Sequence, residues 1–119
     1  MSLQEIADKL VTYCRAGQFE EAQKELFAED AVSIEPMATE AFAKETKGLQ
    51  AIIEKGEKFE SMVAEYHQLE ISAPLLADNS FVISLHMDVT MKEKGRMDMR
   101  ELCVYVVKNG KIVSEQFFM

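Results

Sequence analysis

A chain of 119 residues, 48% hydrophobic and 29% charged, is typical of one globular domain, so we expect a single domain over residues 1–119. Because 21 acidic residues oppose 13 Lys and Arg residues, the formal net charge is −8, which disfavours nucleic acid as a partner. The sequence has neither an apolar run of about 18 residues nor a charged-then-apolar leader, so we predict a cytoplasmic protein that does not bind membranes.

Apolar residues recur at helical spacing in three segments, and each segment predicts a helix. The first covers residues 2–14, where Ser2 and Glu5 form a capping box that satisfies two backbone N–H groups. The second covers residues 19–27, "FEEAQKELF". The third covers residues 48–62, "GLQAIIEKGEKFESM", which has the same helical spacing of apolar residues.

A short strand is predicted between the second and third helices, at "AEDAVSIEP". Its period of two places Ser33 and Glu35 on one face, and Pro36 then ends the strand because it cannot donate to the ladder. The following segment, residues 36–47, fits either a short helix or a flap over a pocket.

The second half of the chain alternates polar and apolar residues, which predicts strands that form an antiparallel meander. Pro74 marks a bend in the first of them, and Asn109-Gly110 is the strongest short hairpin signal in the chain. The predicted strands cover residues 63–77, 81–91, 96–107 and 111–119.

Helices followed by an antiparallel meander are typical of an α+β fold. We expect the N-terminal helices to pack into a strongly curved antiparallel sheet. The result would be a cone-shaped α+β barrel with a pocket at its wide end.

This order of elements, with the segments "AGQFEEAQKELFAEDAVSIEP", "KGLQAIIEKGEKF" and "VVKNGKIVSEQFF", resembles the nuclear transport factor 2-like superfamily. Within that superfamily the chain is most similar to the SnoaL-like domains, over nearly all of its length. The resemblance implies the cone-shaped fold. It implies no single function, because the superfamily holds isomerases, dehydratases, cyclases, small-ligand binders and interaction domains.

The resemblance to ketosteroid isomerase, an enzyme of this superfamily, implies roles for two acids of this chain. Its general base is an acid just before a Pro after the short strand, and Glu35 of "SIEP" matches that position. Its second acid, kept protonated on the next-to-last strand, donates a hydrogen bond to the substrate oxygen, and Glu101 of "MRELCV" lies near that place. The Tyr of its first helix is replaced here by Leu10, so the resemblance does not extend to its complete site.

The residues around Glu101 give an independent reason to expect a pocket. Glu101 shares a strand face with Met99, Cys103 and Tyr105, and a buried acid needs a partner or must stay protonated. We predict that Met99, Cys103 and Tyr105 line the pocket together with Leu10 and Phe59. The alternative for Glu101 is a structural hydrogen-bond hub.

Two other predicted site residues also have structural alternatives. A desolvated Glu35 could take a proton next to a carbonyl, or it could be a solvated carboxylate at a strand end. His67 shares the period-two face of Leu69 and Ile71 and could assist as an acid or base, or it could be a satisfied structural residue.

No metal or cofactor is predicted. His86 and Asp88 have a spacing that could hold two metal ligands, but no third ligand is evident. The chain has no phosphate-binding glycine loop, nucleophile elbow, paired-cysteine motif or HExxH. The resemblance implies that the outer sheet face, which carries His86 and Asp88, forms a homodimer interface. Cys14 and Cys103 are expected to be free core cysteines.

The sequence thus leaves three functions open. The first is a cofactor-free isomerase, dehydratase or cyclase that acts on a small apolar carbonyl compound. The second is a domain that binds a small organic ligand without changing it. The third is a dimerisation or interaction domain whose pocket is filled by its own Met and Phe side chains.

Overall fold

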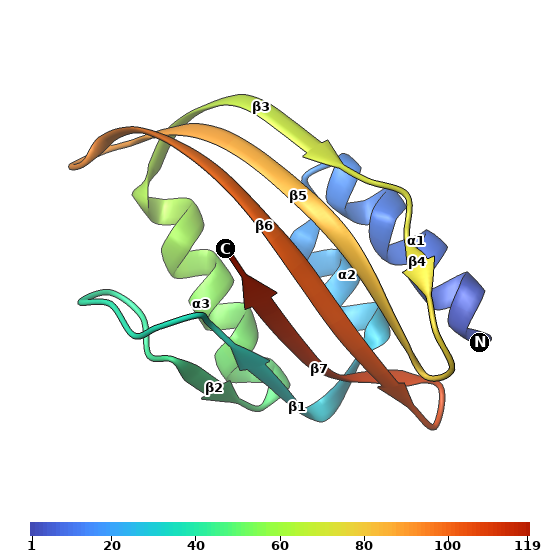
Figure 1. The fold of residues 1–119 in the computed structure, drawn as a ribbon. Helices are drawn as coiled ribbons and strands as arrows, with labels where there is room; N and C mark the ends of the chain where they lie inside the picture. Colours follow the sequence, from blue (N-terminus) through green and yellow to red (C-terminus); the bar gives the residue numbers. More distant parts are fainter.

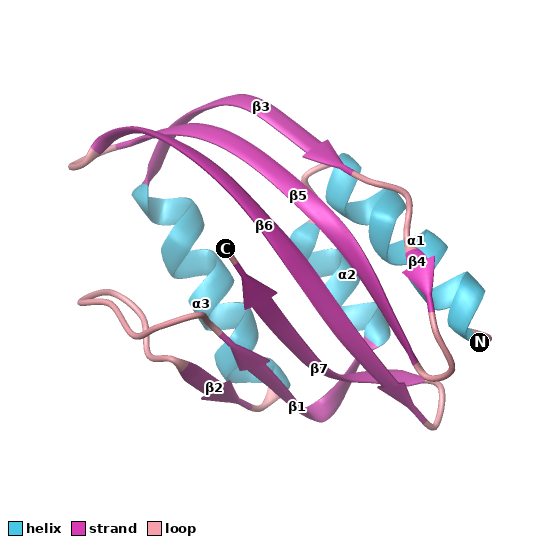
Figure 2. Cartoon of the chain, viewed as in Figure 1, coloured by secondary structure: helices cyan, strands magenta, loops and turns pink.

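The computed structural model describes all residues from 1 to 119 and shows helices packed inside one curved sheet (Figure 1). The helices are α1 (Leu3–Arg15), α2 (Phe19–Leu26) and α3 (Leu49–Met62). The strands are β1 (Phe27–Ile34), β2 (Glu45–Lys47), β3 (Val63–Ile71), β4 (Leu75–Leu76), β5 (Ser80–Met91), β6 (Gly95–Lys108) and β7 (Lys111–Phe118). Figure 2 shows that β3, β5 and β6 bend together over the helices, which confirms the predicted α+β fold with a curved sheet.

The sheet is mixed and open. Its strand order is β2-β1-β7-β6-β5-β3, with β4 paired to β5 beside this path. Most neighbours are antiparallel as predicted, but β1 and β7 run parallel. The outermost strands β2 and β3 do not pair with each other, so the predicted cone is an open curved sheet and not a closed barrel.

The first helix begins and packs as its sequence predicts. The Glu5 backbone N–H donates to Ser2 Oγ at 3.2 Å, and the Ser2 N–H donates to Glu5 Oε1 at 3.1 Å. Its apolar face is buried in the main core, which α1 and α2 form with the sheet. The residues of this face are Ile6, Ala7, Leu10, Val11 and Cys14. No helix of the chain is long and apolar enough to cross a membrane.

The strands of the meander follow the predicted alternation. On β5, Phe81, Ile83 and Met87 are buried, and the intervening polar residues lie on the outer face. The β6–β7 hairpin turns at Asn109 and Gly110, whose φ values of 52° and 75° are those of a tight two-residue turn. The ladders slip at several points along the sheet, within β1–β7, β3–β5 and β6–β7, and such bulges increase the local bend.

Residues 35–44 form a loop between β1 and β2, and not the short helix that was one of two expectations. The Glu35 N–H donates to the Lys44 carbonyl at 2.7 Å, which closes the base of the loop. The loop therefore holds Glu35 where β1 ends.

Candidate functional site

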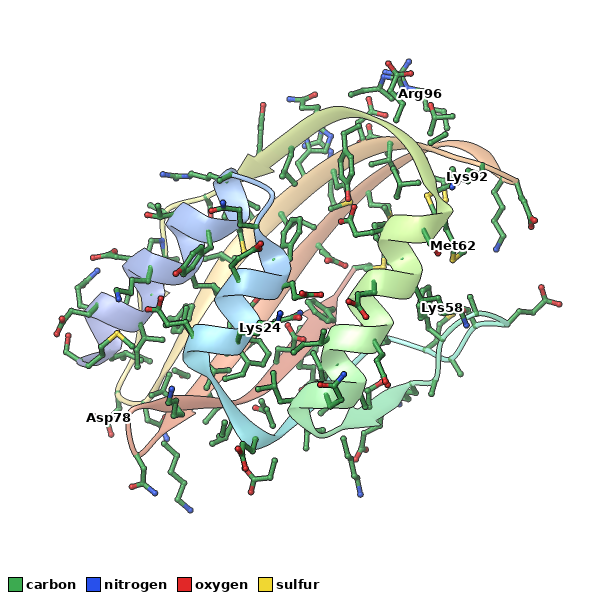
Figure 3. All side chains as sticks on the ribbon, turned by 180° about the vertical axis from the view of Figure 1, so that it is seen from behind. Lys24, Lys58, Met62, Asp78, Lys92 and Arg96 are labelled. Carbon is green, nitrogen blue, oxygen red and sulfur yellow. The ribbon has the colours of Figure 1, made fainter.

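A cavity of about 640 Å³ lies between the concave face of the sheet and helices α2 and α3. Figure 3 shows α2 and α3 side by side, with the strands of the sheet behind them. Of the 31 residues that line the cavity, 18 are hydrophobic. Its size and its apolar walls suit a small organic molecule that is fixed by a few polar groups.

Methionines line the part of the cavity near the β5–β6 hairpin. Met87 and Met91 are buried on β5, and they pack with partly buried Met97 and Met99 from β6 and Met62 from α3. Met62 lies at the end of α3 beside Lys92, whose N–H donates to the Met62 carbonyl at 2.8 Å (Figure 3). Flexible thioether side chains give this wall an adaptable shape.

Lys55 of α3 brings together polar groups on another part of the cavity wall. Its Nζ donates to Ser33 Oγ at 2.6 Å and lies 3.0 Å from Glu35 Oε2. The Lys55 and Glu35 side chains are 16% and 28% exposed, so the pair is shielded from bulk water. Lys55 Nζ also lies 5.6 Å from the centre of the Phe117 ring. An ammonium has three N–H donors, and these contacts leave one of them available to the cavity.

Glu101 projects from β6 into the cavity without a cationic partner. The one hydrogen bond to its carboxyl group comes from the Cys103 thiol, at 3.9 Å, and is weak. Burial raises the pKa of Glu101 to about 7, and the charges of Glu35 and Glu115 act in the same direction while Lys55 opposes them. At neutral pH this carboxyl is therefore poised between its acid and base forms.

Glu115 of β7 is a third acid in the cavity, and only 5% of its surface is exposed. The strand register places it between Ser33 of β1 and Tyr105 of β6. Burial raises the pKa of Glu115 to about 7, against the opposing effects of the Lys55 charge and of the neighbouring Ser33 hydroxyl. Hydrogen bonds thus join Lys55 to Ser33 and Glu35, and Glu115 is the register neighbour of Ser33.

The thiols and the phenol in the cavity wall stay neutral near pH 7. Burial raises the pKa of Cys14 to about 12, and it also raises the pKa values of Cys103 and Tyr105. The Tyr105 ring stacks on Phe81 with ring centres 5.0 Å apart. These groups shape the wall, and neither cysteine has the thiolate character that a nucleophile needs.

Six of the eight residues predicted for the site line the cavity. They are Glu35, Phe59, Met99, Glu101, Cys103 and Tyr105. The structure thus brings the two predicted acids to one cavity, and their catalytic roles remain predictions.

The expectation that His67 and Leu10 face the pocket is wrong. The β3–β5 register shifts between Tyr66 and Gln68, and this bulge turns His67 to the outer face, where its Nε2 lies 2.6 Å from Thr90 Oγ1. Leu10, 2% exposed, packs into the main core under α1, and the cavity does not reach it. Tyr105 lines the cavity. Tyr13 does not, and its hydroxyl donates to Glu25 Oε1 at 2.5 Å outside the cavity.

Lys55 and Glu115 are site residues that the sequence predictions missed. Lys55 stands three residues after Ile52 and four before Phe59, so helical spacing already placed a charge on the inner face of α3. Glu115 gave no such signal. Val106 pairs with Ser114 and Val107 pairs with Ile112, so the β6–β7 ladder has a bulge just before Glu115. An alternation counted from buried Ile112 would therefore place Glu115 on the wrong face of the sheet.

Outside the cavity, His86 and Asp88 each engage a neighbour on the outer face of the sheet. His86 Nε2 lies 2.6 Å from Asp98 Oδ1, and Arg96 donates to both oxygens of Asp88 at 3.0 and 2.9 Å. The structure brings no three His, Cys, Asp or Glu side chains together in a group that could hold a metal ion.

Known structures share this fold over most or all of their length. A presumed SnoaL-like polyketide cyclase from Mesorhizobium loti superposes with a TM-score of 0.93 at 29% identity, covering 100% of both chains. A presumed isomerase from Bacillus subtilis has a TM-score of 0.72 at 23% identity, covering 98% of this chain and 88% of its own. A hypothetical protein from Catenulispora acidiphila with a ketosteroid isomerase-like fold, solved with trimethylamine, has a TM-score of 0.73 at 16% identity, covering 97% and 85%.

The last two similarities show the fold alone. No curated protein matches the sequence. The family model of the SnoaL-like domain, however, matches residues 1–119. The chain therefore belongs to the SnoaL-like domain family.

Proposed function

We propose that this protein binds a small apolar carbonyl compound and catalyses proton transfer at a carbon next to the carbonyl, without a cofactor. The observation that carries the proposal is Glu101, a carboxyl group without a cationic partner in a mostly apolar cavity. A general base works best when its pKa lies near the working pH, and that of Glu101 is raised to about 7. The class of reaction would be isomerisation, dehydration or cyclisation.

In this mechanism the Glu101 carboxylate takes the proton. The C–H bond breaks and its electron pair forms a C=C bond, while the π electron pair of the carbonyl moves onto oxygen, so that an enolate forms. Glu101 then returns the proton to a carbon of the same molecule, which restores the carboxylate and completes an isomerisation. The apolar walls exclude water and hold the ligand beside the acid.

The ion pair changes the roles expected for the two acids. Glu35 was predicted as the base and Glu101 as the neutral hydrogen-bond donor. Glu35 lies 3.0 Å from the Lys55 ammonium, which compensates the charge of the Glu35 carboxylate. Glu101 has no such ion pair and is therefore the better proton acceptor. We therefore assign proton transfer to Glu101 and the positioning of Lys55 to Glu35.

Deuterium exchange at carbon tests this function before the natural substrate is known. A panel of small cyclic ketones and enones would be incubated with the protein in D₂O, and deuterium next to the carbonyl measured by NMR. We expect the wild-type protein to accelerate exchange for some members, with a rate that rises as the pH passes about 7, because the base form of Glu101 is required. Glu101→Gln should lower that rate by about 100-fold or more.

Glu54→Gln is the matched control, since Glu54 is exposed on α3 and does not line the cavity. It should leave the exchange rate unchanged. Exchange that is equally fast in Glu101→Gln would overturn the assignment of Glu101. Ligand-induced chemical shift changes around the cavity, with no exchange above the buffer rate for any compound, would overturn catalysis and leave ligand binding alone.

A further inference from the structure

We infer that Lys55 binds the oxygen of the ligand and stabilises the negative charge that develops there during proton transfer. The inference rests on the proposed function and adds a second catalytic residue to it. Lys55 comes from α3 and Glu101 from β6, and both residues line the cavity. No role for a lysine was expected from the sequence.

The contacts of Lys55 fix the direction of its ammonium. Ser33 of β1 and Glu35 at the end of β1 accept two of its three N–H groups, at 2.6 and 3.0 Å. The centre of the Phe117 ring lies 5.6 Å from Nζ. A long and otherwise flexible side chain is thus held in place, and its third N–H has no acceptor within the protein.

The charges around Lys55 favour a role in stabilising a negative oxygen of the ligand, in addition to its ion pair with Glu35. The carboxyl groups that line this part of the cavity are Glu35, just after β1, Glu101 of β6 and Glu115 of β7, and Lys55 is the cation among them. An enolate oxygen formed near three carboxyl groups would be repelled unless a cation met it. Lys55 can supply that cation without moving, because its two acceptors already orient it.

Phenols of graded acidity test this role without a known substrate, because a phenolate oxygen resembles an enolate oxygen. Phenol and its fluorinated derivatives differ little in size but widely in acidity. Their affinities would be measured at pH 6, where Glu101 and Glu115, with pKa values of about 7, are mostly protonated. We expect the most acidic phenol to bind the wild-type protein about tenfold more tightly than phenol, as one charge-assisted hydrogen bond would provide.

Lys55→Met should reduce that preference to about twofold or less, because it removes the ammonium and keeps most of the apolar stem. Lys55→Arg should retain most of the preference. The matched control is Lys92, an exposed lysine of the β5–β6 turn whose side chain does not line the cavity. Lys92→Met should leave the preference unchanged.

The wild-type protein provides a measurement that does not depend on folding of the variants. The Lys55 side-chain NMR signals should shift when the acidic phenol binds and shift much less with phenol itself. An unchanged preference in Lys55→Met, or unshifted Lys55 signals in a saturated complex, would overturn the inference. Carbon exchange by the wild-type protein would still support proton transfer in that case, so the two proposals can fail separately.

Discussion

Glu115 is the charged residue that the fold buries most completely, with 5% of its surface exposed. Its pKa is raised to about 7 in the folded chain, against an ordinary value of 4.5. The folded chain therefore binds more protons than the unfolded chain between these two pH values. The free energy of unfolding must fall as the pH rises from about 4.5 to about 7, and Glu101 contributes in the same direction.

Replacing Glu115 with Gln should remove its share of this pH dependence. The amide has nearly the same size and shape as the carboxyl group but carries no charge to desolvate. We expect Glu115→Gln to raise the free energy of unfolding at pH 8 by on the order of 2 kcal/mol and to change it little at pH 4. Urea unfolding at both pH values measures this, with exposed Glu29→Gln as the control. The same change at both pH values would contradict a buried charge as the cause.

At the residue scale, the sequence predicted what strict periodicity determines. Glu101 was found because Met99, Cys103 and Tyr105 share its strand face without interruption. The sequence placed His67 in the pocket wrongly and missed Glu115. In both cases an extra residue in a strand ladder turns the neighbouring side chains to the other face of the sheet. Such bulges depend on contacts between strands, which local sequence does not record.

The loop of residues 35–44 covers part of the cavity and is held there by α3. Thr39, Ala41 and Phe42 line the cavity. Lys58 of α3 donates to the Ala41 carbonyl, and its Nζ lies 5.1 Å from the centre of the Phe42 ring. Figure 3 shows Lys58 on the side of α3 that faces this loop. The sequence could not choose between helix and flap because these contacts are distant in the chain.

Lys58→Met should loosen the loop, since it removes both the hydrogen bond and the cation–π contact. Together these contacts are worth about 1–2 kcal/mol, so amide hydrogen exchange at residues 39–42 should accelerate by roughly tenfold. Mass spectrometry or NMR would follow the exchange. Lys47→Met is the control, because the Lys47 side chain is 78% exposed and pairs only with Glu45. Equal exchange in both variants would show that Lys58 does not hold the loop.

At the scale of the whole molecule, the sequence predicted the layers but not the complete strand order of the sheet. Helical and strand periodicity determined which residues face the core. The parallel pairing of β1 with β7 joins distant parts of the chain, and it fixes Ser33 beside Glu115. No local pattern encodes that pairing, although the site depends on it.

The outer face of this sheet carries exposed apolar side chains on two neighbouring strands. Leu102 and Phe118 are register partners on β6 and β7, and they are 50% and 48% exposed. Apolar groups that gather on an open sheet face are typical of an interaction surface. We therefore propose the homodimer that was expected from the sequence, with this pair near its centre.

Light scattering after gel filtration would measure the mass of the protein in solution, and we expect twice the 13.5 kDa of one chain. Leu102→Glu should shift the protein to the mass of one chain, because two like charges would meet apolar partners in a symmetric interface. Met37→Glu places the same charge at a residue that is 67% exposed in the 35–44 loop, and it should leave the mass unchanged. A wild-type protein of single-chain mass, or a Leu102→Glu variant that stays dimeric, would exclude this face as the interface.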